Sequence, residues 1–184
     1  MRIMGFAGSL RKDSYNRALL RAAAELLPAE AELEVFDLEG IPMYNADLET
    51  PLPERVAEFK RRIRSADALL IVTPEYNYSF TGVLKNALDW GSRPSGDNSF
   101  AGKPAAIMGA SDGRFGTTRA QYHLRQVLVS LNMHPMSKPE VLVATAQDKI
   151  DDQGKLVDNR TRDHIKRLLE ALVNWTTRLG KPSP

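Results

Sequence analysis

The segment from residue 8 to residue 16 holds the first group of side chains whose types and spacing could do chemistry. It joins a short apolar run to a helix, and it carries Ser9, Arg11, Ser14 and Asn16 within a few positions. Unpaired backbone N–H groups and the positive end of a helix dipole make such a turn an anion site. Helix capping by a serine or an asparagine is the alternative, but it explains one of these polar residues rather than four. We therefore interpret the segment as a phosphate-binding loop.

Two nucleotide-binding patterns are missing from this loop. GxxxxGK[ST], which is typical of NTPases, is absent, and GxGxxG, which is typical of dinucleotide-binding folds, is absent as well. The phosphate that the loop is expected to bind therefore belongs to another kind of ligand.

A second loop, residues 73–79, follows the most apolar run of the chain and contains a proline, two tyrosines and an asparagine. Such a loop could form a flat wall for a planar heteroaromatic ligand, although a turn with ordinary aromatic packing would look the same. A third loop, residues 109–116, is rich in small residues that let backbone N–H groups approach a ring closely. A simple flexible loop is its alternative interpretation, and Arg114 could reach a phosphate or a substrate anion.

Composition excludes several kinds of chemistry. The chain has no cysteine, so disulfides, iron–sulfur clusters, thiolate zinc sites and a cysteine nucleophile are impossible. Its three histidines are isolated in sequence, and we expect no metal site from them. A net charge of +2 does not favour nucleic-acid binding, and the basic cluster at 60–64 is interpreted as a solvated helix face. Without a signal peptide or an apolar run of membrane-spanning length, the expected compartment is the cytoplasm.

Strand-like and helix-like segments alternate along all 184 residues, which indicates one α/β domain over 1–184 with a parallel sheet and helices on both faces. Doubly wound sheets of this kind bind ligands beyond the carboxyl ends of their strands, where the three loops lie. The expected strands are 3–7, 32–38, 68–72, 104–109 and the later part of 133–143. The expected helices are 16–27, 54–64, 82–90, 117–131 and 161–179.

Taken together, the loops resemble the NADPH-dependent FMN reductase family, whose members include quinone and chromate reductases. The family's GS-x-R-x-x-S-x-N loop stands at 8–16, its PEYN segment at 74–77 and its LKNA-x-DW helix at 84–90. The likeness extends from residue 3 to residue 143. One position departs from the pattern: Thr81 stands where the family commonly has proline before the glycine of its third helix.

The resemblance implies a flavodoxin-like three-layer sandwich with strand order 2-1-3-4-5, FMN as cofactor, and NADPH or NADH as electron donor. No side chain is expected to be catalytic, because the flavin carries the chemistry. Hydride would pass to the flavin and then, in a ping-pong cycle, to quinones or to other small acceptors such as chromate, azo compounds or free flavin. The implied cofactor-binding residues are Ser9, Arg11, Ser14, Tyr15 and Asn16 for the phosphate, Pro74, Glu75, Tyr76 and Asn77 for the isoalloxazine, and Ala110, Ser111 and Gly113 on its opposite side.

Two rival functions remain open: a flavodoxin-type electron carrier and a flavin-binding protein without turnover. A carrier is usually strongly acidic, unlike this chain. Members of the family pack their third and fourth helices across subunits, which implies a homodimer or homotetramer through helices near 82–91 and 117–131. The second of these helices carries apolar residues beyond one stripe, as a helix buried on two sides should, with Val129 off the main stripe.

Overall fold

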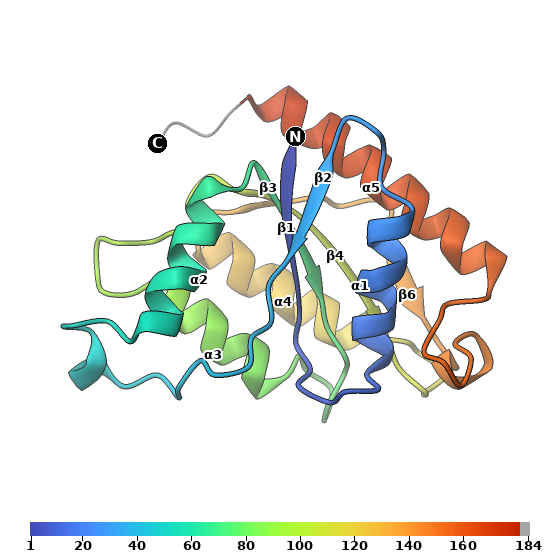
Figure 1. Cartoon of the computed structure of the whole chain (residues 1–184), viewed down its shortest axis with the longest axis horizontal. Coiled ribbons are helices and arrows are strands. Elements are labelled where there is room, and N and C mark those ends of the chain that lie inside the picture. Colours follow the sequence, from blue (N-terminus) through green and yellow to red (C-terminus); the bar gives the residue numbers. More distant parts are fainter. Residues whose placement is uncertain (181–184) are drawn as a thin grey trace.

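A parallel β-sheet forms the middle layer of the protein in the computed structural model, which describes residues 1–180 (Figure 1). The strands stand in the order β2-β1-β3-β4, and β5 and β6 both pair with β4 in parallel register. The predicted order 2-1-3-4-5 is therefore confirmed. The strands are β1 (Arg2–Ala7), β2 (Glu32–Val35), β3 (Ala68–Val72), β4 (Pro104–Ala110), β5 (His134–Pro135) and β6 (Val141–Val143).

Five α-helices cover the two faces of this sheet, as Figure 1 shows. The first and last helices pack on one face, and the other three pack on the opposite face. The predicted three-layer sandwich is confirmed. The helices are α1 (Tyr15–Glu25), α2 (Glu54–Ser65), α3 (Gly82–Gly91), α4 (Thr118–Ser130) and α5 (Asn159–Leu179), and two short 3₁₀ helices occupy Ala46–Leu48 and Ala146–Asp148.

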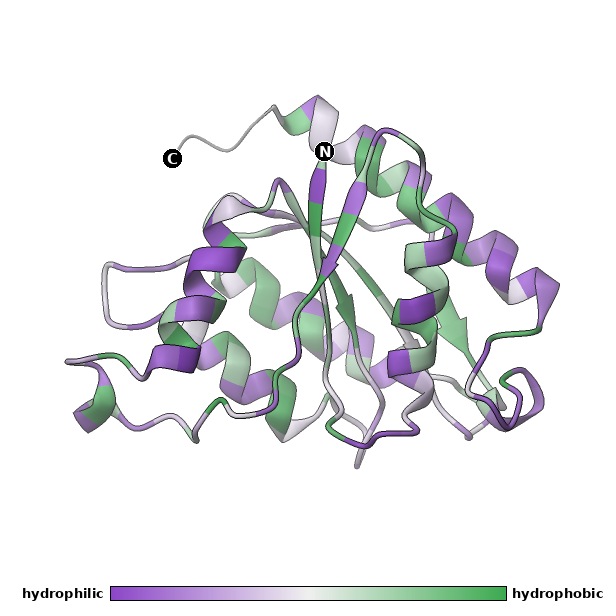
Figure 2. Ribbon diagram, viewed as in Figure 1, coloured by the Kyte–Doolittle hydropathy of each residue, from purple (hydrophilic) through white to green (hydrophobic). Residues whose placement is uncertain are grey.

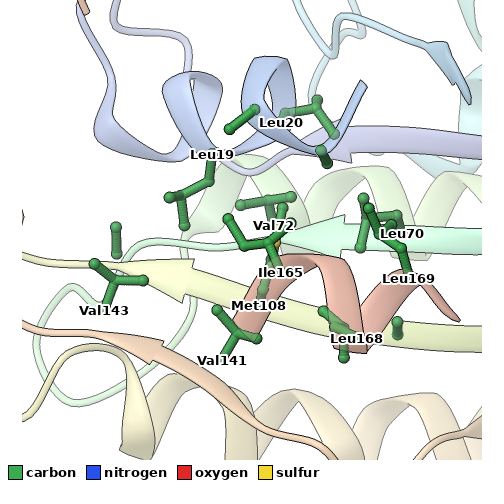
Figure 3. Packing of buried hydrophobic residues seen from close by; sticks show 14 of the residues in the cluster. Leu19, Leu20, Leu70, Val72, Met108, Val141, Val143, Ile165, Leu168 and Leu169 are labelled. Carbon is green, nitrogen blue, oxygen red and sulfur yellow. The ribbon is translucent and has the colours of Figure 1, made fainter. Parts of the chain in front are cut away.

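Each face of the sheet has its own hydrophobic core. Under α1 and α5 the core is aliphatic, and Figure 3 shows Leu19, Val72 and Ile165 meeting there. The core on the other face includes aromatic side chains among aliphatic ones, and the rings of Phe6 and Phe59 meet there edge to face. Because β3 and β4 are buried on both faces, their sequences are continuous apolar runs. The polar faces of the helices point outward (Figure 2).

The last strand differs from the prediction in being divided. The chain pairs with β4 at β5, leaves the sheet, and pairs again at β6. Proline has no backbone N–H to donate to the ladder, and Pro139 lies in the interval between the two pieces. In that interval Arg125 of α4 donates a hydrogen bond to the carbonyl of Met136. The sequence predicted only the later piece.

The basic cluster on α2 is not a uniformly solvated face, so that interpretation was wrong for Lys60. This side chain is only 1% exposed, and its ammonium group donates to the carbonyls of Arg93 and Asp97 and pairs with the Asp97 carboxylate at 3.2 Å. Burial lowers the pKa of Lys60, and the hydrogen bond to Asp97 opposes that shift only in part. Helical periodicity missed this contact because the partner loop lies more than thirty residues further along the chain.

Candidate functional site

Three loops meet at the carboxyl ends of β1, β3 and β4, next to the point where the strand order reverses. They enclose a shallow cleft of about 100 Å³. Ten of the twelve residues that the sequence predicted for a cofactor site line this one cleft, and Asp112 joins them. The lining residues are Ser9, Arg11, Ser14, Tyr15 and Asn16 of the first loop, Pro74, Glu75 and Tyr76 of the second, and Ala110, Ser111 and Asp112 of the third.

Size alone would not have identified this cleft. A cavity of about 380 Å³ lies against α5 and shares no residue with the three loops. Its lining mixes apolar side chains with Lys138 and Arg178 and includes no residue of the helix N-termini. The cleft is distinguished by the kinds of residue that it brings together.

The first loop presents the N-terminus of α1 to the cleft. Ser14 is the N-cap residue, and its hydroxyl accepts a hydrogen bond from the backbone N–H of Asn16 at 3.2 Å. Arg11 is exposed, donates to the carbonyl of Asp13 at 2.6 Å and lies over the Tyr15 ring at 5.2 Å from its centroid. A helix N-terminus with a neighbouring guanidinium is suited to an anion with several oxygens.

Asn16 connects the first loop with the third. Its side-chain N–H donates to the carbonyl of Ala110 at 2.9 Å, and its side-chain oxygen accepts from the backbone N–H of Ala110 at 2.9 Å. The amide is 2% exposed. Besides lining the cleft, Asn16 therefore holds the end of β4 in register with the start of α1, a contact that no local pattern predicts.

Arg17 is a residue of this region that the sequence did not single out. Its guanidinium donates to the carbonyl of Ser9 at 3.0 Å and to the carboxylate of Asp37 at 2.9 Å, so it ties the first loop to the segment that follows β2. Arg17 directly follows the family's loop motif, but the sequence carried no signal for its partner twenty positions away.

Thr81, the departure from the family pattern, has two contacts. Its hydroxyl donates to the carbonyl of Gly8 at 2.6 Å and accepts from the backbone N–H of Leu84 at 3.2 Å, as the N-cap of α3. A side chain at Gly8 would place its Cβ only 2.9 Å from this hydroxyl. The threonine thus links the first loop to α3, which a proline could not do because it has no hydroxyl.

The second loop ends in a tight turn. Tyr76 and Ser79 exchange backbone hydrogen bonds of 2.9 and 3.0 Å, and the two residues between them have left-handed backbone angles, with φ of 48° at Asn77 and 69° at Tyr78. Asparagine tolerates this conformation better than tyrosine does. Asn77 therefore lies at the tip of the turn and does not line the cleft, unlike Pro74 and Tyr76.

The third loop closes the cleft with small residues. A Cβ at Gly109 would lie 2.2 Å from the Thr73 carbonyl, so only glycine permits β4 to end this close to the second loop. Gly113 is absent from the lining, and its N–H donates to the Ser111 hydroxyl at 3.1 Å.

Among residues 1–180, no three His, Asp or Glu side chains gather as a metal site. No helix in the same range is long and apolar enough to cross a membrane.

A doubly wound sheet in the order 2-1-3-4-5, with an anion-suited loop after its first strand, defines a flavodoxin-like protein. Comparison with known proteins narrows this class. The model of the NADPH-dependent FMN reductase family matches residues 1–148, and the chain belongs to that family. It is accordingly an oxidoreductase that uses FMN and NAD(P)H.

Relatives of nearly the same length support this assignment. An NAD(P)H-dependent FMN reductase of Pseudomonas aeruginosa is 53% identical over 97% of each chain. A 2-hydroxy-1,4-benzoquinone reductase of a Burkholderia species is 43% identical over 95% of this chain and 96% of its own. Among solved structures, the flavoenzyme NAD(P)H:(acceptor) oxidoreductase FerB from Paracoccus denitrificans superimposes with a TM-score of 0.89, at 37% identity and over 97% of this chain and 98% of its own.

Proposed function

We propose that this protein transfers two electrons from NADPH or NADH to quinones through bound FMN, in a ping-pong cycle. The observation that carries the proposal is the meeting of ten predicted residues from three distant loops in one cleft. The names of the relatives support quinones as the acceptors, since several are quinone reductases.

The residues present fit FMN. At the first loop, the hydroxyl of Ser9, the guanidinium of Arg11 and the positive end of the α1 dipole would hold the terminal phosphate. Pro74 and Tyr76 would form one wall for the ring system, and Ala110 and Ser111 would lie on the other side. FMN, when bound, supplies the hydride-accepting and electron-donating chemistry.

The shape of the cleft supports an alternating use of one open face. A cleft of about 100 Å³ is much smaller than the few hundred Å³ of ordinary ligand pockets, so it would leave much of a bound ring uncovered. Nicotinamide and a quinone are both planar and could stack there only in turn. The chain's own contribution would be to orient the ring and to direct backbone N–H groups at its polar edge.

A spectrum of the purified protein tests the proposal. The protein should be yellow, the flavin released from it should be FMN rather than FAD, and NADPH should bleach the flavin rapidly in the absence of any partner protein. Reoxidation by a benzoquinone should then follow without a further protein. A colourless protein that does not quench the fluorescence of added FMN would overturn the proposal, and a flavin that NADPH leaves oxidised would favour an electron carrier instead.

We also propose a homodimer or homotetramer that assembles through α3 and α4. The exposed apolar side chains of α4 support this assembly: Tyr122 is 53% and Val129 is 66% exposed. By resemblance to the family, Arg125 and Glu140 would pair between subunits, although within one chain Arg125 donates to the Met136 carbonyl and Glu140 accepts from Lys138. The cytoplasmic location expected from the sequence stays a prediction, which fractionation of expressing cells would test.

A further inference from the structure

We propose that Glu75 is a positioning residue, which clamps the second loop to the N-terminus of α4 and thereby sets the wall against which the flavin ring would lie. The proposal rests on the proposed function, because it concerns the same cleft. It assigns to Glu75 a role other than direct contact with the cofactor.

Three hydrogen bonds hold the Glu75 carboxylate at the N-terminus of α4. Glu75 Oε2 accepts hydrogen bonds from the backbone N–H groups of Arg119 at 2.9 Å and Ala120 at 3.1 Å. Glu75 Oε1 accepts from the Arg119 guanidinium at 3.1 Å. The side chain is 10% exposed. With three donors already directed at it, this carboxylate is committed to α4.

The N-terminus of α4 needs such a partner. The first N–H groups of a helix have no acceptor within the helix, and a side chain at the N-cap usually supplies one. Thr117 occupies the N-cap here without such a bond, and its hydroxyl instead accepts from the Gln121 side chain at 2.9 Å. Glu75 supplies the missing acceptor from forty-four residues away, with a negative charge that suits the helix dipole.

Arg119 extends the clamp to the tip of the second loop. Its guanidinium lies 4.0 Å from the centroid of the Tyr78 ring and 4.7 Å from that of Phe115, close enough for cation–π attraction to both. Tyr78 has the left-handed backbone conformation that is costly for a tyrosine. The stacking on Arg119 is a contact that offsets part of this cost and keeps the turn closed.

The contacts of Glu75 also restrain its two neighbours in the chain. Pro74 and Tyr76 flank Glu75 directly, and both line the cleft. Fixing Glu75 on α4 therefore fixes the two residues that would face the ring. Without the clamp, the loop would have to be ordered when the cofactor binds, and that ordering would weaken binding.

The test compares Glu75→Ala with Asp158→Ala in the full-length protein. Asp158 caps α5 through the backbone N–H of Thr161 at 2.8 Å and does not line the cleft. Both variants lose a cap and should melt at lower temperature. FMN affinity, measured by quenching of FMN fluorescence well below either melting temperature, should fall about tenfold or more in Glu75→Ala and stay within about twofold in Asp158→Ala.

A second readout is the visible circular dichroism of the bound flavin, which reports the asymmetry of its surroundings and which loss of stability alone would not change. We expect it to change in Glu75→Ala and to remain in Asp158→Ala. If Glu75→Ala does not fold, Glu75→Gln takes its place, because its amide oxygen still accepts from the helix while the ion pair to Arg119 is lost. We expect Glu75→Gln to show a smaller loss of affinity in the same direction.

The outcomes separate the two proposals. If the parent protein binds FMN and the Glu75 variant that folds binds it equally well with the same dichroism, the clamp is overturned and the proposed function stands. If the parent protein itself does not bind FMN, the proposed function fails, and this inference fails with it. Equal losses of affinity in the Glu75 and Asp158 variants would reduce Glu75 to a helix cap.

Discussion

At the scale of single residues, substitution of Arg11 tests whether its guanidinium contacts the ligand or is only a surface charge. Its guanidinium is exposed, and within residues 1–180 no carboxylate forms an ion pair with it. If it reaches the FMN phosphate, the charge-assisted contact should be worth roughly 1.5–3 kcal/mol. Arg11→Ala should therefore weaken FMN binding about tenfold or more in a fluorescence titration, with little change in the stability of the protein without cofactor.

Arg61 provides the matched control for that experiment. It is also an exposed arginine, but it lies on α2 and does not line the cleft. Arg61→Ala should bind FMN as the parent does. Equal affinity in the Arg11 variant and the parent would assign Arg11 to the solvent and leave the phosphate to the helix N-terminus alone.

At the scale of elements, Thr81 joins the start of α3 to the first loop through one hydroxyl. Thr81→Val keeps the shape of the side chain but removes both hydrogen bonds. Losing a helix cap and a buried bond to the Gly8 carbonyl should lower the free energy of unfolding by about 1–3 kcal/mol, measured by urea denaturation. Thr81→Ser keeps the hydroxyl and should lose much less. If valine and serine were equally stable, the hydroxyl would have no part in this link.

The α5 N-cap gives the protein a contribution to stability that depends on pH. Hydrogen bonds from the side chain and the backbone N–H of Thr161 lower the pKa of Asp158 below its usual range. The unfolded chain therefore takes up this proton first as the pH falls, and the stabilisation by the charged cap is lost below about pH 4. Asp158→Asn, whose cap has no charge, should be less stable than the parent near neutral pH, and the gap in urea midpoints should shrink under acid conditions. A gap that is constant with pH would contradict this assignment.

At the scale of the whole molecule, the exposed face of α4 is where the proposed assembly can be tested. Val129 is 66% exposed, whereas the neighbouring Leu128 is fully buried and its substitution would test folding rather than association. Val129→Glu should shift the mass measured by light scattering at micromolar concentration from an oligomer towards the monomer, because a charge in an apolar interface is costly to bury. Val157 is 52% exposed in the loop before α5, outside α3 and α4, and Val157→Glu should leave the mass unchanged. A parent protein with monomer mass would contradict the assembly but not the flavin assignment, since one chain supplies all three loops.

The sequence by itself determined the layers and the loops that form the cleft, and its resemblance to the family implied the order of the strands. Strands buried on both faces, such as β3, must be continuous apolar runs, and amphipathic helices must alternate with them. The spacing of apolar residues therefore indicates which positions are buried. The residues of the first loop could be recognised because a motif of this kind is local: Ser9 to Asn16 are brought together by one strand-to-helix turn.

Only the tertiary structure decided which of those residues line the cleft and which ones hold other residues in place. The amide of Asn16 is bonded to Ala110, ninety-four positions away, and the carboxylate of Glu75 caps α4. Lys60 is buried because a distant loop covers it, and the last strand is split around Pro139. These roles depend on partners that lie far apart in the chain. A polar side chain has the same local pattern whether it faces solvent, a ligand or a backbone group, and only the folded neighbours distinguish these environments.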